Sequence, residues 1–278
     1  MLPPMFDLTG RKALVAGSTR GIGRSIAEQL VLHGASVTIS GRNEEECRSV
    51  AAEINAQAGR EAAWGCTFDI GELDQIHRLV DEHVAYWGGL DILVGNAFSS
   101  TLGSAEELDP VDFLEVLRIN IVNNSALAVR ALPALKTSGA GAIVFVGSAS
   151  GLAASPGVAA YGISKRGMLH MVQNLAVEWG QFNIRVNALV PGYTRTPTSE
   201  AMYQDAAKVA ERTSGWPIAR AGEPDEVAAG CIYLCSPGAG FTTGTTVICD
   251  GGRTLLSGNA TLNIIRWTGT STPTATAC

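Results

Sequence analysis

The stretch KALVAGSTRGIGRSIAEQLVLHG, residues 12–34, decides the fold of this chain. Residues 12–17 form a short, mainly apolar run, which is typical of a buried strand. Residues 21–34 repeat apolar side chains at helical spacing and end in glycine, which predicts a helix. The turn between these two elements is rich in glycine. A strand, a glycine-rich turn and a helix in this order indicate a site for a phosphate group at the start of the helix.

Each glycine of this turn has a reason to lack a side chain. Gly17 can make the tight turn after the strand, Gly21 lets the backbone approach a phosphate, and Gly23 lets helix and strand pack closely. The N–H groups and the positive dipole end of the helix would then face a pyrophosphate. We therefore predict dinucleotide binding, and the alternative is a plain strand–helix turn. The predicted cofactor contacts in this turn are Gly17, Ser18, Thr19, Arg20, Gly21, Ile22 and Gly23.

The rest of the chain repeats this alternation of apolar strands and amphipathic helices. Such alternation predicts an α/β fold in which helices cover both faces of a mostly parallel, seven-stranded, doubly wound sheet, as in a Rossmann fold. We expect one domain over 1–253, because no linker interrupts it, and a tail over 254–278. The predicted strands are 12–17, 36–40, 62–68, 90–96, 141–148, 184–192 and 244–252, and the predicted helices are 21–34, 43–59, 73–89, 110–135, 161–180 and 223–235.

Composition and charge restrict the partners. The net charge of −6 and the pI near 5.3 argue against nucleic acid and anionic membranes as partners. The start of the chain lacks the basic and apolar regions of a secretory signal, and no apolar run is long enough to span a bilayer. We therefore expect a cytoplasmic protein. The six cysteines follow no zinc-binding spacing, so no metal site is expected.

The end of the second predicted strand indicates which dinucleotide is bound. An NAD-binding protein of this kind carries an acid here, which grips the ribose 2′-hydroxyl, but this chain has Gly41 followed by Arg42. Arg42, helped by Arg20 in the glycine turn, could bind a 2′-phosphate, so we predict NADP(H) in preference to NAD(H). The alternative is that Arg42 is a solvated residue at a helix entry. Asp69, with its neighbour Ile70, follows the third strand and is a candidate for the adenine, or a simple turn acid.

The segment YGISK, residues 161–165, contains the chemistry. Tyr161 and Lys165 are four residues apart, which places them on one face of a helix as either a surface pair or a catalytic pair. Ser148 ends the fifth predicted strand, and Asn120 falls inside a predicted helix, where asparagine is a poor helix former. Together with the glycine turn, this ordered set resembles the classical short-chain dehydrogenase/reductase family, and the resemblance covers residues 6–253 or so.

The resemblance implies that Tyr161 is the general acid/base of hydride transfer between NADP(H) and a carbonyl or secondary alcohol. Tyrosine titrates near 10, so this role requires a pKa nearer 7. The family resemblance implies that the ammonium of Lys165 and the positive nicotinamide ring together lower that pKa, and that Lys165 holds the nicotinamide ribose. It also implies that Ser148 binds the substrate oxygen and that Asn120 holds a water for proton relay. The predicted catalytic residues are Asn120, Ser148, Tyr161 and Lys165.

The segment after the sixth predicted strand, beginning PGYTRTP, is expected to cover the site. By resemblance, Pro191, Gly192, Thr194 and Thr196 would contact the cofactor, and residues of about 194–218 would form a mobile substrate lid. Its aromatic side chains could equally serve to pack the lid. The residues predicted to line the substrate pocket are Phe98, Ser148, Tyr161, Tyr193, Met202 and Trp216, with Tyr203 as a further candidate.

One departure from the family pattern follows the fourth predicted strand. The family usually has Asn-Asn-Ala-Gly there, whereas this chain reads GNAF, with Gly95 in place of the first Asn and Phe98 in place of the glycine. Asn96 and Ala97 match the family and are predicted to contact the cofactor. The first Asn normally ties neighbouring strands, so that tie is in doubt. We expect Phe98 to narrow the pocket.

These observations leave three functions to be weighed. The leading one is an NADP-dependent carbonyl reductase or alcohol dehydrogenase acting on a small molecule. The alternatives are an NAD-dependent alcohol dehydrogenase of the same family and a non-catalytic dinucleotide-binding sensor. The complete Asn, Ser, Tyr and Lys set favours an enzyme, because a sensor has no need of proton transfer. The resemblance also implies a homo-oligomer, a dimer or a homotetramer, paired through the helices near 110–135 and 161–180.

Overall fold

The computed structural model describes residues 4–101 and 103–255, without the side chains of Thr198, Ala201 and Met202. The predicted tail therefore lies outside the described residues from position 256 onward. Within the described ranges, no helix has the length and apolar character needed to cross a bilayer.

The core of the fold is a seven-stranded parallel sheet in the order β3-β2-β1-β4-β5-β6-β7. All seven predicted strands are present, close to their predicted bounds. The chain order reverses between β1 and β4, and in such a sheet the crevice at the carboxyl ends of these strands is where ligands bind. The strands are β1 (Lys12–Ala16), β2 (Ser36–Gly41), β3 (Ala63–Thr67), β4 (Ile92–Gly95), β5 (Ala142–Val146), β6 (Arg185–Pro191) and β7 (Thr246–Cys249).

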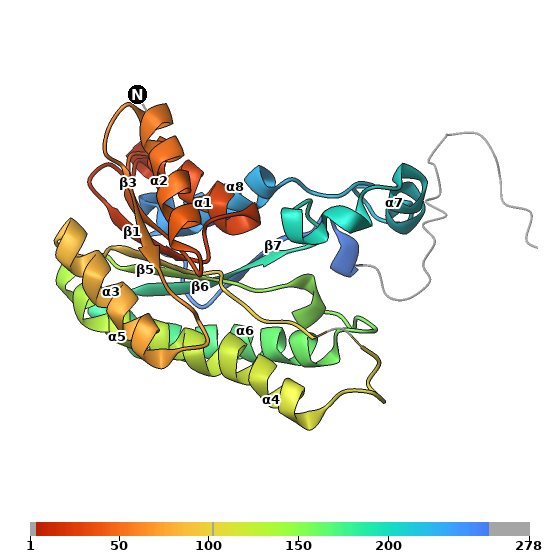
Figure 1. The fold of residues 1–278 in the computed structure, drawn as a ribbon. Helices are drawn as coiled ribbons and strands as arrows, with labels where there is room; N and C mark the ends of the chain where they lie inside the picture. The colour runs from red at the N-terminus through yellow and green to blue at the C-terminus, as the bar shows by residue number, and fades with distance from the viewer. Residues whose placement is uncertain (1–3, 102, 256–278) are drawn as a thin grey trace, which may run out of the picture.

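Helices cover both faces of the sheet, as the alternation predicts (Figure 1). One face carries α1 (Gly21–Leu32), α2 (Glu44–Ala58) and α8 (Pro224–Cys235). The other face carries α3 (Leu73–Trp87), α4 (Pro110–Leu117), α5 (Asn124–Ser138) and α6 (Ala159–Trp179). The short helix α7 (Ala206–Thr213) lies beyond one end of the sheet, in the segment predicted to be a lid.

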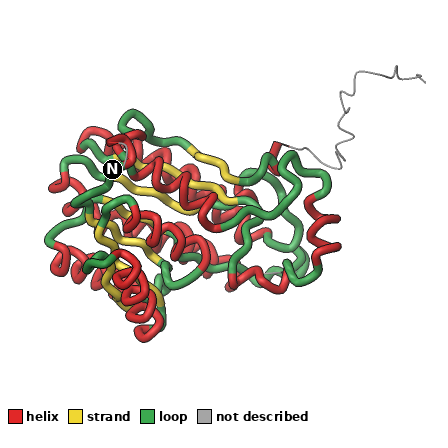
Figure 2. The backbone as a smooth tube through the Cα atoms, turned by 90° about the horizontal axis from the view of Figure 1, so that it is seen from above, coloured by secondary structure: helices red, strands yellow, loops and turns green. Residues whose placement is uncertain are grey.

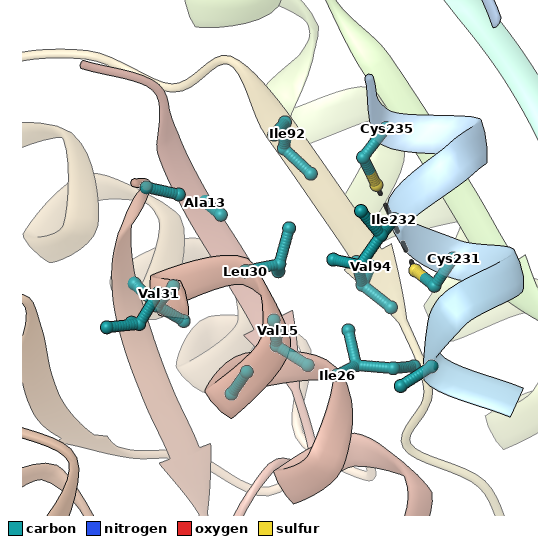
Figure 3. Close-up of a cluster of buried hydrophobic side chains, with 14 of the residues drawn as sticks. Ala13, Val15, Ile26, Leu30, Val31, Ile92, Val94, Cys231, Ile232 and Cys235 are labelled. Atoms are coloured by element: carbon teal, nitrogen blue, oxygen red, sulfur yellow. Dashed lines mark hydrogen bonds between the residues drawn. The ribbon is translucent and has the colours of Figure 1, made fainter. Parts of the chain in front are cut away.

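Strand β1 shows why the sheet is buried on both faces. Successive side chains of a strand point to opposite faces. Val15 therefore packs with Ile26 and Leu30 of α1 on one face (Figure 3), while Leu14 belongs to the core on the other face. Val15 is level with Val94 of β4, so the apolar layer continues into the neighbouring strand. The apolar cores on the two faces of the sheet therefore both pack against β1, the strand that leads into the glycine turn.

The helix predicted over 110–135 is interrupted. Residues Arg118–Asn123 form a π-helical segment between α4 and α5, so the side chains after it are rotated relative to a continuous α-helix. Periodicity over such a short insertion does not differ visibly from that of an ordinary helix, which is why the sequence predicted one element. Inserted turns of this kind are frequent at functional sites, and Asn120 lies within this one.

A buried histidine gives the fold a pH dependence. His83 of α3 is fully buried, its Nδ1 lies 2.7 Å from Thr38 Oγ1, and the Trp87 indole donates to the same oxygen at 3.0 Å. Burial lowers the pKa of His83 to about 4 from 6.5. Above pH 6.5 the imidazole of His83 is mostly neutral in both the folded and the unfolded protein. Between pH 6.5 and pH 4 the unfolded chain binds a proton at His83, whereas the folded protein keeps the ring neutral.

We therefore expect the free energy of unfolding to fall by about 2 kcal/mol between pH 7 and pH 5, as the unfolded chain gains that proton. Urea unfolding at a series of pH values measures it. The variant His83→Gln should lose most of this slope. The control His170→Gln, at an exposed histidine of α6, should keep it. Equal slopes in the His83→Gln and His170→Gln variants would contradict the assignment to His83.

Candidate active site

A cavity of about 770 Å³ lies at the carboxyl ends of the strands, where the connecting loops gather (Figure 2). Most of the predicted site residues line it, although they come from seven separate segments of the chain. Ser18, Asn120 and Trp216 do not line it, and the side chain of Met202 is outside the described residues. The predicted residues that line it are Gly17, Thr19, Arg20, Gly21, Ile22, Gly23, Arg42, Asp69, Ile70, Asn96, Ala97, Phe98, Ser148, Tyr161, Lys165, Pro191, Gly192, Tyr193, Thr194 and Thr196.

The glycine turn is as compact as the sequence predicts. Gly17 has a φ of +76°, and a Cβ on Gly23 would lie 2.1 Å from the carbonyl oxygen of Gly17. Asn96 Nδ2 donates to that same oxygen at 2.6 Å, which ties the end of β4 to the turn. The first turn of α1 has no side-chain cap, so its N–H groups remain for a ligand in the cavity.

The hydroxyl of Ser18 connects the glycine turn to β1 and β2. Its hydroxyl donates to the carbonyl of Val15 at 2.8 Å and accepts from the backbone N–H of Ser40 at 2.9 Å. The Ser40 hydroxyl donates to the same carbonyl at 2.8 Å, so β2 is tied to the turn by two side chains. Ser40 is not among the predicted site residues, because a serine inside a strand carries no signal of its own.

The end of β2 leaves no room for a side chain at position 41. A Cβ on Gly41 would lie 2.8 Å from Thr19 Cγ2, so the acid typical of NAD binding would displace Thr19. Arg20 and Arg42 are exposed at this rim of the cavity. Among the described residues, no carboxylate lies within ion-pair distance of either guanidinium. Asp69, further along the wall, accepts a hydrogen bond from the backbone N–H of Gly71 at 2.8 Å.

Lys165 is the deepest polar group of the site. Only 1% of its surface is exposed, and Nζ donates to the carbonyl of Val146 at 2.7 Å. Burial lowers the pKa of Lys165 to about 7. The Nζ atom lies 5.6 Å from the centre of the Tyr161 ring, so the two residues share one helix face as their spacing predicts.

The protein groups around Tyr161 raise the pKa of its phenol. Burial has the larger effect, and a hydrogen bond with Ser148 only partly opposes it. The lowering implied by the resemblance also depends on the positive nicotinamide ring, so it stays a prediction. Because burial also destabilises the ammonium of Lys165, a lower Tyr161 pKa needs the nicotinamide charge in addition to that of Lys165.

The side chain of Asn120 is held by hydrogen bonds to two serines. Its Oδ1 accepts from the backbone N–H of Ser99 at 2.8 Å, and its Nδ2 donates to the Ser99 carbonyl and to Ser164 Oγ, each at 2.8 Å. The Ser164 hydroxyl in turn donates to the carbonyl of Tyr161 at 2.7 Å. Asn120 therefore joins the loop after β4 to the first two turns of α6 and holds the helix that carries Tyr161. The relay water that the resemblance implies for Asn120 stays a prediction.

The structure explains why Gly95 replaces the asparagine of the family pattern. A Cβ at Gly95 would lie 2.5 Å from Cδ1 of Phe145, so the phenylalanine of β5 occupies the space that the side chain would need. Asn124 stands on the other side, with an Oδ1 that is buried and has no hydrogen-bond partner. The tie from the first asparagine is therefore absent, and a buried aromatic ring fills its place.

Phe98 lies beside the catalytic pair. Its ring centre is 5.6 Å from that of Tyr161 and 5.3 Å from Lys165 Nζ. About half of the side chain, 48%, remains exposed where it lines the cavity.

Three aromatic side chains in and beside the predicted lid pack against one another. The Tyr193 ring lies 4.8 Å from that of Tyr203 and 5.7 Å edge-on from that of Trp216. Tyr193 and Tyr203 line the cavity, whereas Trp216 packs behind Tyr193 and does not reach it. Trp216 is thus a lid-packing residue, which was the alternative left open. Tyr203 is likewise among the aromatic side chains predicted as possible lining of the pocket, and it does line the cavity.

A doubly wound sheet with a glycine turn and a half-buried Tyr161 beside a buried Lys165 at one crevice defines an NAD(P)-binding oxidoreductase. The family model described as Enoyl-(Acyl carrier protein) reductase matches residues 16–254. A tropinone reductase homologue of Arabidopsis thaliana is 34% identical over 251 residues, covering 90% of this chain and 94% of that protein. Dehydrogenase/reductase SDR family member 4 of Bos taurus is 33% identical over 246 residues, covering 88% of each chain.

A solved structure agrees with these relatives. The gluconate 5-dehydrogenase of Burkholderia cenocepacia, determined in complex with NADP and tartrate, is 31% identical. It superposes with a TM-score of 0.86, over 91% of this chain and 99% of that one. The chain therefore belongs to the short-chain dehydrogenase/reductase family of oxidoreductases.

Proposed function

We propose that this protein transfers hydride between NADP(H) and a carbonyl or secondary alcohol, with Tyr161 as the general acid/base. One observation carries the proposal: Tyr161, Ser148 and the buried Lys165 meet on one wall of a cavity whose other end is the glycine turn. A sensor has no use for a buried ammonium beside a phenol, since both are costly to desolvate.

The residues present fit a dinucleotide. The turn around Gly17 and Gly23 is too tight for side chains, and the uncapped start of α1 offers N–H groups suited to a pyrophosphate. Lys165 Nζ donates to the Val146 carbonyl and lies 4.0 Å from Met168 Sδ, so at least one of its three N–H donors remains for the hydroxyls of a nicotinamide ribose. When bound, the nicotinamide would supply or accept the hydride.

Each residue of the pair then has a definable task. Ser148 would donate its hydroxyl to the substrate oxygen and fix the position of that atom. Tyr161 would give this oxygen its proton in reduction, or remove it in oxidation. Lys165, as an ammonium, would favour the phenolate of Tyr161 and so move its pKa down from the raised value set by burial. Asn120 would act on the reaction through α6, as a positioning residue.

The cofactor preference rests on Arg42 and Arg20, both exposed at the rim with no ion pair among the described residues. The solved relative that contains NADP supports the same choice. We expect Arg42→Asp to lower kcat/KM for NADPH by about 10- to 100-fold, since a charge-assisted hydrogen bond contributes about 1.5–3 kcal/mol. The value for NADH should stay within about threefold. The matched control Arg48→Asp, at an exposed arginine of α2 facing Glu44, should change neither. Unchanged use of NADPH by the Arg42→Asp variant would refute this assignment.

A panel of ketones and secondary alcohols tests the proposed activity itself. NADPH oxidation in the presence of a ketone, or NADP reduction in the presence of an alcohol, would support it. Equal rates with NADH would favour the NAD-dependent alternative of the same family. Tight dinucleotide binding without turnover of any compound would favour the non-catalytic sensor.

The wider setting is also part of the proposal. We place the activity in one cytoplasmic domain over 1–253, with a substrate lid over 194–218. A dimer or tetramer is supported by exposed apolar side chains on the helices expected to pair: Val111, Leu114 and Val129 of α4 and α5, and Val177 of α6.

A further inference from the structure

We propose that the substrate is an uncharged carbonyl compound whose flat apolar group stacks on Phe98. The inference rests on the proposed function and specifies its substrate class. It comes from where charge lies on the cavity wall and from where the Phe98 ring stands.

All but one of the charged side chains that line the cavity lie in one half of it. The described lining residues contributed by β1, α1, the ends of β2 and β3 and the start of α2 include two cations and two acids: Arg20, Arg42, Glu46 and Asp69. The described lining residues contributed by β4, β5, β6, their loops and α6 include a single charged group, Lys165, which we assign to Tyr161 and to the cofactor. The sheet order places these two sets on opposite sides of the switch between β1 and β4.

The uncharged half is built from hydroxyl groups and aromatic rings. Ser99, Ser100 and Ser148 line it together with Tyr193 and Tyr203. The lid arginines Arg195 and Arg212 contact these two tyrosines but do not line the cavity themselves. Arg195 pairs with Glu223, and Arg212 donates to the Tyr193 hydroxyl at 2.7 Å. A carboxylate or phosphate on the substrate would therefore lose its water without gaining a cationic partner among the described residues.

The position of Phe98 determines what touches the substrate next to the reacting carbon. A carbonyl oxygen that takes a proton from Tyr161 lies within hydrogen-bond distance of its hydroxyl, so the groups on the carbonyl carbon extend a few ångströms further. The Phe98 ring centre is 5.6 Å from the Tyr161 ring centre, at an interplanar angle of 54°. The two rings thus form a corner, and Phe98 is still 48% exposed there. An aromatic or cyclic group can cover that exposed ring at the spacing of stacked rings.

Three carbonyl compounds test the effect of substrate charge and the effect of a flat ring separately. Ethyl benzoylformate is a neutral keto ester with a ring, benzoylformate is its anionic acid, and ethyl pyruvate is a neutral keto ester with a methyl group in place of the ring. We expect kcat/KM with NADPH to be at least about 100-fold higher for ethyl benzoylformate than for benzoylformate, because an unpaired buried charge is disfavoured. We expect kcat/KM for ethyl benzoylformate to be about 10-fold or more above kcat/KM for ethyl pyruvate.

A variant of the wall isolates the stacking. Phe98→Leu keeps an apolar side chain but removes the flat ring, so it should reduce the preference for ethyl benzoylformate over ethyl pyruvate about 3- to 10-fold. The change should appear in KM, with kcat within about threefold. The control Phe182→Leu, at an aromatic ring that packs under Lys136 away from the cavity, should keep the preference. Benzoylformate used as well as its ester, or a preference unchanged in Phe98→Leu, would overturn the inference.

Binding measurements separate this inference from the proposed function. Calorimetric titration of the Tyr161→Phe variant with NADPH present gives the Kd of each compound without turnover. If wild-type protein reduces none of the three compounds, the proposed activity on them fails. The ratio of the three Kd values still decides the inference, since comparable binding of ester and acid would refute it.

Discussion

Replacing Tyr161 with phenylalanine is expected to lower kcat by about 10²- to 10⁴-fold, the range that a positioned general acid contributes. The substitution removes one oxygen and keeps the ring that packs against Phe98. Only the proton transfer and the hydrogen bond with Ser148 are lost. Steady-state NADPH oxidation with a ketone that the wild-type protein reduces measures the effect.

Two controls make this result specific. NADPH affinity of the Tyr161→Phe variant, followed by cofactor fluorescence, should stay within about threefold, and its Tm should not fall. The matched variant Tyr203→Phe removes a phenol oxygen from the lid wall of the same cavity, so its kcat should stay within about threefold of wild type. Near-normal turnover by Tyr161→Phe, or an equal loss in Tyr203→Phe, would show that Tyr161 is not the proton donor.

The parts of this site that the sequence predicted are those encoded locally. The glycine turn depends on a strand, three glycines and a helix within one short stretch, and Gly23 meets the carbonyl of Gly17 only six positions earlier. The Tyr161–Lys165 pair likewise depends on helical spacing alone. The parallel, doubly wound sheet followed from the alternation of strands and helices and from the handedness of crossovers, and the meeting of distant segments followed from the family resemblance.

The parts that the sequence could not predict depend on contacts between distant elements. The direction of the Tyr161 pKa shift depends on how deeply α6 buries the phenol, which no spacing reports. Asn120 could be identified as unusual in a helix, but its contacts with Ser99 and Ser164 require the π-helical segment, which local periodicity does not reveal. Gly95 was visible only as a departure, because its cause, Phe145, lies on another strand.

The glycine at position 95, where the family has asparagine, gives a second prediction with a large expected effect on stability. Restoring the family residue with Gly95→Asn should lower the free energy of unfolding by about 3 kcal/mol or more. The new Cβ would lie 2.5 Å from Cδ1 of Phe145 and 3.0 Å from Oδ1 of Asn124. Overpacking of this kind costs about 1–3 kcal/mol before the amide itself is buried. The control Gly59→Asn, at the left-handed C-cap of α2 with open space around it, should shift stability by less than about 1 kcal/mol.

A double-mutant cycle between positions 95 and 145 tests whether Phe145 occupies the space of the missing side chain. Phe145→Ala alone should cost about 3–5 kcal/mol because it leaves a cavity beside β4. In the double variant the asparagine enters that cavity, where its amide can donate to the unpartnered Oδ1 of Asn124. The double variant should therefore be more stable than the sum of the two single effects, by about 1–3 kcal/mol in urea unfolding. If Gly95→Asn does not fold, Gly95→Ala in the same cycle keeps the Cβ contact testable. Additive effects would mean that Phe145 does not occupy the place of the missing side chain.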